Sequence, residues 1–200
     1  MRFTATATSA LVLAASIVAS AAYAADLPTR TAPAVFTPMS QPTPSILSEV
    51  RFGVTAHDPF SPEKGSVDIN GEVLFSKFFR SDNAIIDLLI PRLHVGGSVN
   101  TAGKTSYAYA GFTWNYDITK EIFVEATFGG AFHNGETGDF VQKHRNSLGC
   151  SPLFRESAAI GYRLTDNWSI MATVDHMSNA GLCDQNRGLT NVGAKIGYTF

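Results

Sequence analysis

Residues 167–200, NWSIMATVDHMSNAGLCDQNRGLTNVGAKIGYTF, decide the fold. They contain two segments in which apolar and polar residues alternate, joined by a loop rich in Gly, Asn and Asp, and they end on the aromatic Phe200. Alternation with a period of two is typical of a β-strand with one apolar face. The stretch therefore predicts two strands, 167–178 and 189–200, joined by a long loop.

The same alternation occurs six more times earlier in the sequence, at about 48–58, 66–78, 88–98, 105–117, 120–132 and 153–164. In the second of these segments Val67 and Ile69 share one face, and Asp68 and Asn70 share the other. Turn-forming residues separate the segments, and no helical period of 3.6 residues is evident between them. The sequence therefore predicts an all-β fold of eight strands.

This pattern fits both a soluble lipocalin-like barrel and an outer-membrane barrel, because the two differ only in which face is apolar. The even strand number, the aromatic residues near strand ends, and the alternation of tight turns (118–119, 165–166) with long loops (133–152, 179–188) favour the membrane barrel. The connection at 79–87 is longer than that rule prefers. We predict an eight-stranded antiparallel transmembrane β-barrel whose lumen holds a polar cluster: Arg51, Asp68, Glu72, Arg92, Glu125, Arg163, Asp175 and Lys195.

The N-terminus has the features of an export signal. Arg2 precedes an apolar run at about 10–22 and the small-residue site Ala-Tyr-Ala at 22–24, which predicts a signal peptide over 1–24. Residues 25–47, rich in Pro, Thr and Ala, are expected to be a flexible lead-in to a barrel at 48–200. A net charge of −2 gives no case for a nucleic-acid partner.

Two further pairs of residues bear on chemistry. Cys150 and Cys183, in an exported chain, predict a disulfide, with two free thiols as the alternative. His176 and Ser178 are two residues apart in one strand and therefore share a face, as a base and a hydroxyl nucleophile would. If the N-terminus is periplasmic, that strand ends outside the cell, which places both side chains at the external rim of the barrel and facing lipid.

The segment 176–182, HMSNAGL, followed by Asn186, Gly188 and the closing strand, resembles the outer-membrane lipid A 3-O-deacylase (PagL-type) family. A weaker likeness extends over 154–164. The resemblance implies a Gram-negative outer-membrane location and a serine esterase that removes the 3-linked hydroxyacyl chain of lipid A in lipopolysaccharide. It implies Ser178 as nucleophile and His176 as general base, with no cofactor and no metal.

The resemblance also implies an oxyanion site and a catalytic acid. Asn179, Asn186 and the backbone amides near Gly181 are the candidates for the oxyanion. The family has a Glu early in the last strand where this sequence has Thr190, so the acid is missing from its expected position. If a three-residue loop (165–167) joins strands six and seven, Glu156 lies opposite His176 and points outward as well.

Three interpretations of the missing acid stay open: Glu156 replaces or assists it, Thr190 supports a Ser–His dyad, or the chain is an inactive relative.

Lys143 and Arg145, in the loop at 133–152, are candidates for contacting lipid A phosphates, although a solvated charge run is the simpler reading. The main competing function is a non-enzymatic structural or adhesive barrel, followed by a lipocalin-type carrier. The sequence also leaves open whether two copies form a homodimer.

Overall fold

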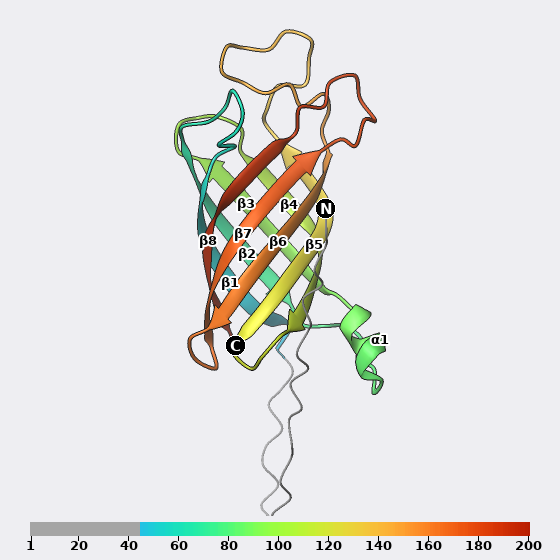
Figure 1. The fold of residues 1–200 in the computed structure, drawn as a ribbon. Coiled ribbons are helices and arrows are strands. Elements are labelled where there is room, and N and C mark those ends of the chain that lie inside the picture. The colour runs from blue at the N-terminus through green and yellow to red at the C-terminus, as the bar shows by residue number, and fades with distance from the viewer. Residues whose placement is uncertain (1–44) are drawn as a thin grey trace, which may run out of the picture. The chain divides into compact units, whose positions relative to one another are not determined.

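The computed structural model describes residues 45–200, which form a closed barrel of eight antiparallel strands and one short helix (Figure 1). Each strand pairs with the next along the chain, and β1 pairs with β8 to close the barrel. The predicted fold class is confirmed. The predicted signal peptide (1–24) and residues 25–44 of the predicted lead-in lie outside the described residues.

The eight strands lie close to the eight segments expected from the alternation of the sequence. They are β1 Leu47–Ala56, β2 Val67–Phe75, β3 Arg92–Asn100, β4 Tyr107–Asp117, β5 Ile122–His133, β6 Leu153–Arg163, β7 Trp168–Ser178 and β8 Leu189–Thr199. The differences are confined to a few residues at strand ends. The largest is in the third segment, because Leu88 and Leu89, predicted to begin a strand, belong to a short helix and the strand begins at Arg92.

The connections differ in length between the two ends of the barrel. At one end, which we call the loop end, lie L1 (57–66), L2 (101–106), L3 (134–152) and L4 (179–188). At the opposite end, the turn end, β4–β5 and β6–β7 are joined by tight turns, as predicted. Outer-membrane barrels have short periplasmic turns and longer external loops, so the loop end is the external one.

The third connection at the turn end contains helix α1, Ala84–Leu89, which the sequence did not predict. Asn83 caps this helix by accepting hydrogen bonds from the backbone N–H groups of Ile85 and Ile86. Six residues are too few for a helical period to show in a sequence. Among residues 45–200, no helix is long and apolar enough to cross a bilayer.

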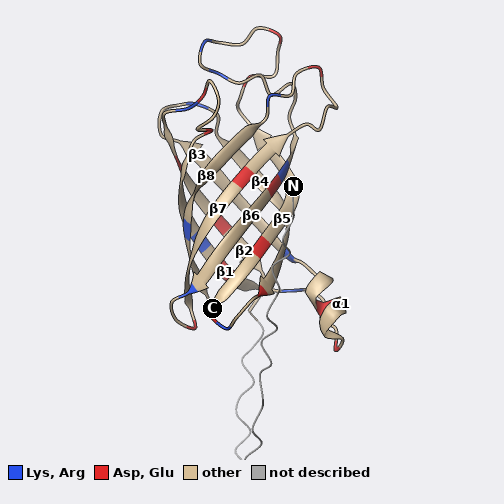
Figure 2. Ribbon diagram, viewed as in Figure 1, with Lys and Arg blue, Asp and Glu red and all other residues tan. Residues whose placement is uncertain are grey.

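The lumen is polar, as predicted. Most members of the predicted cluster are buried, and charges lie along the strands as well as in the loops (Figure 2). Arg51 contacts Glu125 at 2.6 Å, and Lys195 contacts Glu72 at 3.0 Å. Arg92 and Arg163 are less buried and lie toward the turn end. These ion pairs satisfy buried charges that would otherwise be very unfavourable in the interior.

The outer wall has the opposite character. Apolar side chains project from every strand, and those more than two-fifths exposed include Phe52, Val95, Phe112, Phe128, Ile160, Ile170 and Val174. A wall of this kind around a charged lumen is the arrangement of a barrel in lipid, and it excludes the soluble lipocalin-like alternative.

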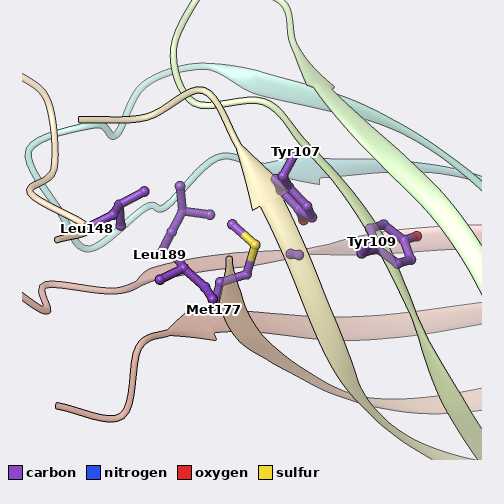
Figure 3. Close-up of a cluster of buried hydrophobic side chains, with 7 residues drawn as sticks. Tyr107, Tyr109, Leu148, Met177 and Leu189 are labelled. Carbon is purple, nitrogen blue, oxygen red and sulfur yellow. The ribbon is translucent and has the colours of Figure 1, made fainter. Parts of the chain in front are cut away.

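An apolar cluster fills the lumen just beneath the loop end (Figure 3). Tyr107 and Tyr109 of β4 pack there with Met177 of β7 and Leu189 of β8, and Leu148 of L3 joins them. Met177 is fully buried and stands between His176 and Ser178 in the chain. Because neighbouring residues of a strand face opposite sides, burying Met177 turns His176 and Ser178 to the outer wall.

Candidate active site

His176 and Ser178 lie on the outer face of β7 at its loop end. Both are half-buried. Asp175, which precedes His176, and Met177, which stands between the two, are buried on the lumen side. The predicted shared face of His176 and Ser178 is therefore confirmed. No hydrogen bond joins their side chains in the part of the chain that the structure describes.

The strands on either side of β7 each place one polar residue beside His176. Glu156 of β6 and Thr190 of β8 are both its register partners, so the predicted placement of Glu156 is confirmed. Only Thr190 makes a bond: its Oγ1 lies 2.8 Å from His176 Nδ1. Glu156 is exposed and, among residues 45–200, forms no hydrogen bond or ion pair with His176.

The opposite edge of the His176 ring faces Gly188, at the end of L4. A Cβ on Gly188 would lie 3.0 Å from His176 Cε1 and 3.4 Å from Nε2, and the backbone there has φ +70°. Both observations favour glycine, which adopts positive φ readily and leaves room for the ring. With Nδ1 bonded to Thr190, Nε2 is the nitrogen left to act as a base.

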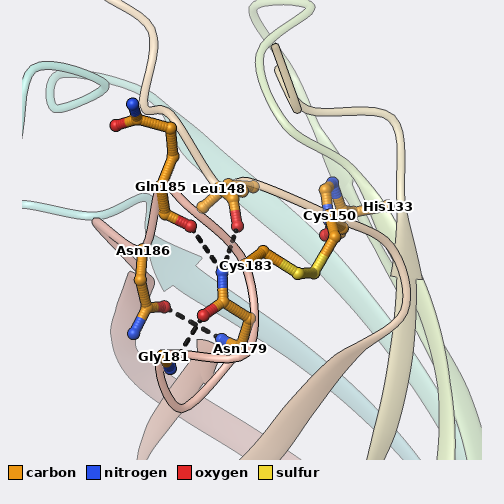
Figure 4. Close-up of a disulfide and its surroundings, with 8 residues drawn as sticks. All are labelled: His133, Leu148, Cys150, Asn179, Gly181, Cys183, Gln185 and Asn186. Atoms are coloured by element: carbon orange, nitrogen blue, oxygen red, sulfur yellow. Dashed lines mark hydrogen bonds between the residues drawn. A yellow bond between two sulfur atoms is a disulfide. The ribbon is translucent and has the colours of Figure 1, made fainter. Parts of the chain in front are cut away.

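L4 is braced by Asn179, which is almost fully buried (Figure 4). Its Nδ2 donates to the carbonyl oxygens of Leu148 (3.0 Å) and Gln185 (2.5 Å), and its Oδ1 accepts from the N–H of Gly181 at 2.8 Å. Asn186 Oδ1 accepts from the backbone N–H of Asn179 at 2.9 Å. The amides of Asn179 and Gly181, two of the predicted oxyanion groups, are thus engaged within the loop.

Asn186, the other predicted oxyanion residue, is exposed, and its side-chain NH2 group makes no hydrogen bond within residues 45–200. A disulfide joins Cys150 of L3 to Cys183 of L4 beside it (Figure 4). The bond ties the two loops that flank β6 and β7, and His133 Nε2 holds the carbonyl oxygen of Cys150 at 2.8 Å. L3 and L4 therefore form one cross-linked cap next to Ser178.

A largely apolar groove of about 410 Å³ lies at the loop end of β5 and β6, next to Asn179 at the start of L4. Phe154, the register partner of Ser178, lines it, and the rings of Phe154 and Phe128 stack with centroids 6.0 Å apart. The rest of the lining is contributed by β5, β6 and the two linked loops: Gly129, Gly130, Cys150, Pro152, Leu153, Asn179 and Leu182. A groove of this composition fits a hydrocarbon chain.

The two basic residues predicted to meet phosphate differ in their surroundings. Arg145 is directed to other loops, donating to the carbonyl oxygen of Gly103 at 3.2 Å and lying 3.8 Å from Glu63. Lys143 is exposed. The sequence interpretation missed Arg187, which lines a second hollow of about 430 Å³ together with Thr190, on the β8 side of His176.

Metal-binding groups are not a feature of this region. Within residues 45–200, no three His, Cys, Asp or Glu side chains come together in a way that could hold a metal ion. The polar groups on the wall are instead those of acyl-transfer chemistry, a hydroxyl and an imidazole, placed beside an apolar groove.

The fold and the site together define an outer-membrane β-barrel that presents hydrolase-type side chains on its lipid-facing wall. The family model described as lipid A 3-O-deacylase (PagL) matches residues 88–199, which is more than half of the chain. The chain belongs to this family, and it is therefore a lipid A hydrolase of the outer membrane. A search of curated proteins found no match.

One solved structure agrees on the fold. The crystal structure of the outer-membrane enzyme PagL superposes with a TM-score of 0.58 at 17% identity, covering 76% of this chain and 100% of that one. A de novo designed transmembrane β-barrel gives 0.49 at 15% identity, covering 78% and 96%. The N-terminal β-barrel domain of Pseudomonas aeruginosa OprF gives 0.48 at 12%, covering 78% and 98%.

Proposed function

We propose that the barrel deacylates lipid A as a serine esterase, with Ser178 as the nucleophile and His176 as the general base. The observation that carries the proposal is the orientation of His176. Thr190 Oγ1 holds Nδ1 at 2.8 Å, and this leaves Nε2 on the face that Ser178 shares. When Nδ1–H donates to the Thr190 hydroxyl oxygen, Nε2 is the unprotonated nitrogen and can accept the proton of Ser178.

The reaction then follows in two halves. Nε2 accepts the hydroxyl proton of Ser178 while Oγ forms a bond to the carbonyl carbon of the 3-linked ester. The bond from that carbon to the sugar oxygen breaks, and His176 returns the proton to this oxygen. In the second half a water molecule gives its proton to Nε2 and its oxygen bonds to the acyl carbon. Ser178 leaves with the proton, and a 3-hydroxy fatty acid is released.

The oxyanion of each tetrahedral intermediate needs a donor near Ser178. The side-chain NH2 group of Asn179 already donates to two carbonyl oxygens, so the unbonded NH2 group of Asn186 is the better donor of the two predicted asparagines. On the acid, the geometry favours the Thr190-supported dyad over Glu156, because Thr190 is the residue that bonds His176.

The substrate is positioned by the two hollows beside the Ser–His pair. The apolar groove next to Ser178 takes the acyl chain that is cut, because Phe154 and Leu182 offer it hydrocarbon contacts. The hollow on the other side of His176 takes the polar headgroup, with Arg187 available to its phosphate. An ester joining the two parts then lies across Ser178.

Mass spectrometry of lipid A incubated with the purified, refolded barrel tests this function. The wild type is expected to remove one 3-hydroxyacyl mass, and Ser178→Ala is expected to remove none. Ser169→Ala is the matched control, because it makes the same change in the same strand on the lumen side. It should leave deacylation intact.

Deacylation that survives Ser178→Ala would overturn the serine mechanism while leaving the family activity in place. No deacylation by the wild type, in detergent and in outer-membrane vesicles alike, would instead favour an inactive relative or the structural and adhesive barrel.

A further inference from the structure

Asp58, the second residue of L1, lies beside the first residues of β8, because β1 and β8 are paired neighbours. Its carboxylate Oδ1 accepts a hydrogen bond from the backbone N–H of Thr190 at 3.0 Å. Its own N–H donates to the side chain of Asn191 at 3.0 Å, and Asn146 of L3 donates to its other carboxylate oxygen. Asp58 is 5% exposed. The buried carboxylate of Asp58 is thus bonded to β8 at Thr190, the residue that bonds to His176.

The backbone of Asp58 is in an unusual conformation. Its φ of +37° lies in the left-handed region, which is unfavourable for residues with a side chain. Such a residue persists where its surroundings fix it, and strain of this kind tends to gather at functional sites. Here three hydrogen bonds, to Thr190, Asn191 and Asn146, fix the residue.

The contacts form a chain from Asp58 to the base. Asp58 holds the backbone of Thr190, and the hydroxyl of Thr190 holds Nδ1 of His176 at 2.8 Å. We propose that Asp58 is the positioning residue of the catalytic histidine, acting through Thr190 in place of a carboxylate bonded directly to the ring. This inference rests on the proposed function, because it assigns a role within that mechanism.

A carboxylate in this position fixes the backbone of the residue whose hydroxyl bonds to His176. A hydroxyl group can orient the ring, but its own position depends on the backbone that carries it. The other nearby carboxylates are unsuited: Glu156 has no bond to His176, and Asp175 points into the lumen, where it is paired with Arg155. Asp58 is the acidic side chain that contacts Thr190.

Anchoring of L1 does not depend on Asp58 alone. Glu63, farther along L1, is fully buried and bonds to His57, Thr105 and the backbone N–H of Asn146. Glu63 does not contact Thr190. It is therefore a matched control: a buried carboxylate of the same loop, with a comparable set of hydrogen bonds, that contacts neither Thr190 nor His176 and is joined to Asp58 through Asn146.

The test is a double-mutant cycle between positions 58 and 190, with kcat and KM measured on lipid A in mixed micelles. Asp58→Asn is expected to lower kcat about five-fold or more and to leave KM within about two-fold. In a Thr190→Val background, which lacks the hydroxyl that transmits the effect, Asp58→Asn should change kcat by less than about two-fold. Glu63→Gln should leave kcat nearly unchanged in both backgrounds.

A second arm places a carboxylate beside His176 with Thr190→Glu. Asp58→Asn should then have little effect, because the ring no longer depends on the longer route. The proposal is overturned if Asp58→Asn lowers kcat by the same factor with Thr, Val or Glu at position 190, or does not lower it at all. An equal loss in Glu63→Gln would also overturn it, since that result reports a general loosening of L1. If the wild type is inactive, the proposed function itself has failed, so the two failures are distinguishable.

Discussion

Asp175 and His176 are neighbours in β7, yet they lie on opposite faces of the barrel wall and in opposite circumstances. Asp175 faces the lumen, where it is buried and paired with Arg155, which also lies 3.6 Å over the ring of Tyr109. His176 faces lipid, and Thr190 is its bonded side-chain partner. Most charged groups in the lumen are paired with each other, although Thr55 Oγ1, Glu72 Oε1 and Ser98 Oγ have no partner within residues 45–200. Polar side chains on the outer wall, such as His176 and Ser178, keep atoms without hydrogen bonds in an apolar setting. This is unfavourable unless a substrate bonds to them.

The wall side of the comparison predicts the largest effect. His176→Ala removes the general base, so deacylation of lipid A should fall roughly 10²–10⁴-fold. The thermal unfolding midpoint should change little, because the side chain is half-buried and makes one side-chain hydrogen bond. Lipid A mass spectrometry and circular dichroism measure the two quantities on one preparation. A variant that keeps more than a tenth of the activity would remove His176 from the mechanism.

The lumen side predicts the opposite signature. Arg155→Met leaves Asp175 buried without its partner, and breaking a buried ion pair in this way costs about 3–5 kcal/mol of unfolding free energy. The double variant Arg155→Met with Asp175→Leu should recover much of that loss, since no charge is left unpaired. Denaturant unfolding measures both. A loss in the double variant as large as in Arg155→Met alone would show that the charge pair is not the cause.

Local alternation made much of this molecule predictable. It determines the eight strands, the polar lumen and the outward direction of His176 and Ser178, because the two-residue period of a strand assigns each side chain a face. Counting back from the 165–167 turn also placed Glu156 opposite His176, which the register confirms. The predicted reaction came from the resemblance of residues near Ser178 to the deacylase family.

Contacts between distant loops were not predictable in this way. Asp58 follows Ala56 by two residues, and Thr190 precedes its partner Val192 by two, so their contact continues the β1–β8 pairing. No turn joins the first strand to the last, so the local sequence does not set the register between them. The choice between Glu156 and Thr190 was also open, because both flank His176 in register and only side-chain conformation decides which one bonds to it. Helix α1 was missed because it has only six residues.

Thr190 and Glu156, the residues on either side of His176, allow a comparison within the outer wall, with a smaller expected effect on kcat. Thr190→Val removes the hydrogen bond to Nδ1 and should lower kcat about ten-fold or more, because that bond strengthens as the ring becomes charged. Glu156→Gln should stay within about two-fold of the wild type. Steady-state kinetics on lipid A compare the two variants. A larger loss for Glu156→Gln would assign the acid to β6 instead.

The smallest effect concerns pH and the anchoring of L1. Burial opposes the charged form of His57, but its hydrogen bonds to Asp68 and Glu63 outweigh burial and raise the pKa of His57 from 6.5 to about 9. A group with a raised pKa in the folded state stabilises it fully below pH 6.5 and loses that contribution as pH rises through about 9.

The matched control for this effect is His57→Gln, which cannot be charged. The thermal midpoint of the wild type should therefore fall relative to that of His57→Gln between pH 6 and pH 10. Equal pH dependence in the two proteins would show that His57 is not charged in the folded state.

The most direct test of the central claim is covalent capture of the nucleophile on the wall. An alkyl fluorophosphonate reacts with a serine only when a neighbouring base activates the hydroxyl. Peptide mass spectrometry of the treated barrel should find one adduct, on Ser178, and His176→Ala should abolish it. A barrel that deacylates lipid A while Ser178 stays unlabelled, or that is labelled equally with and without His176, would contradict the account.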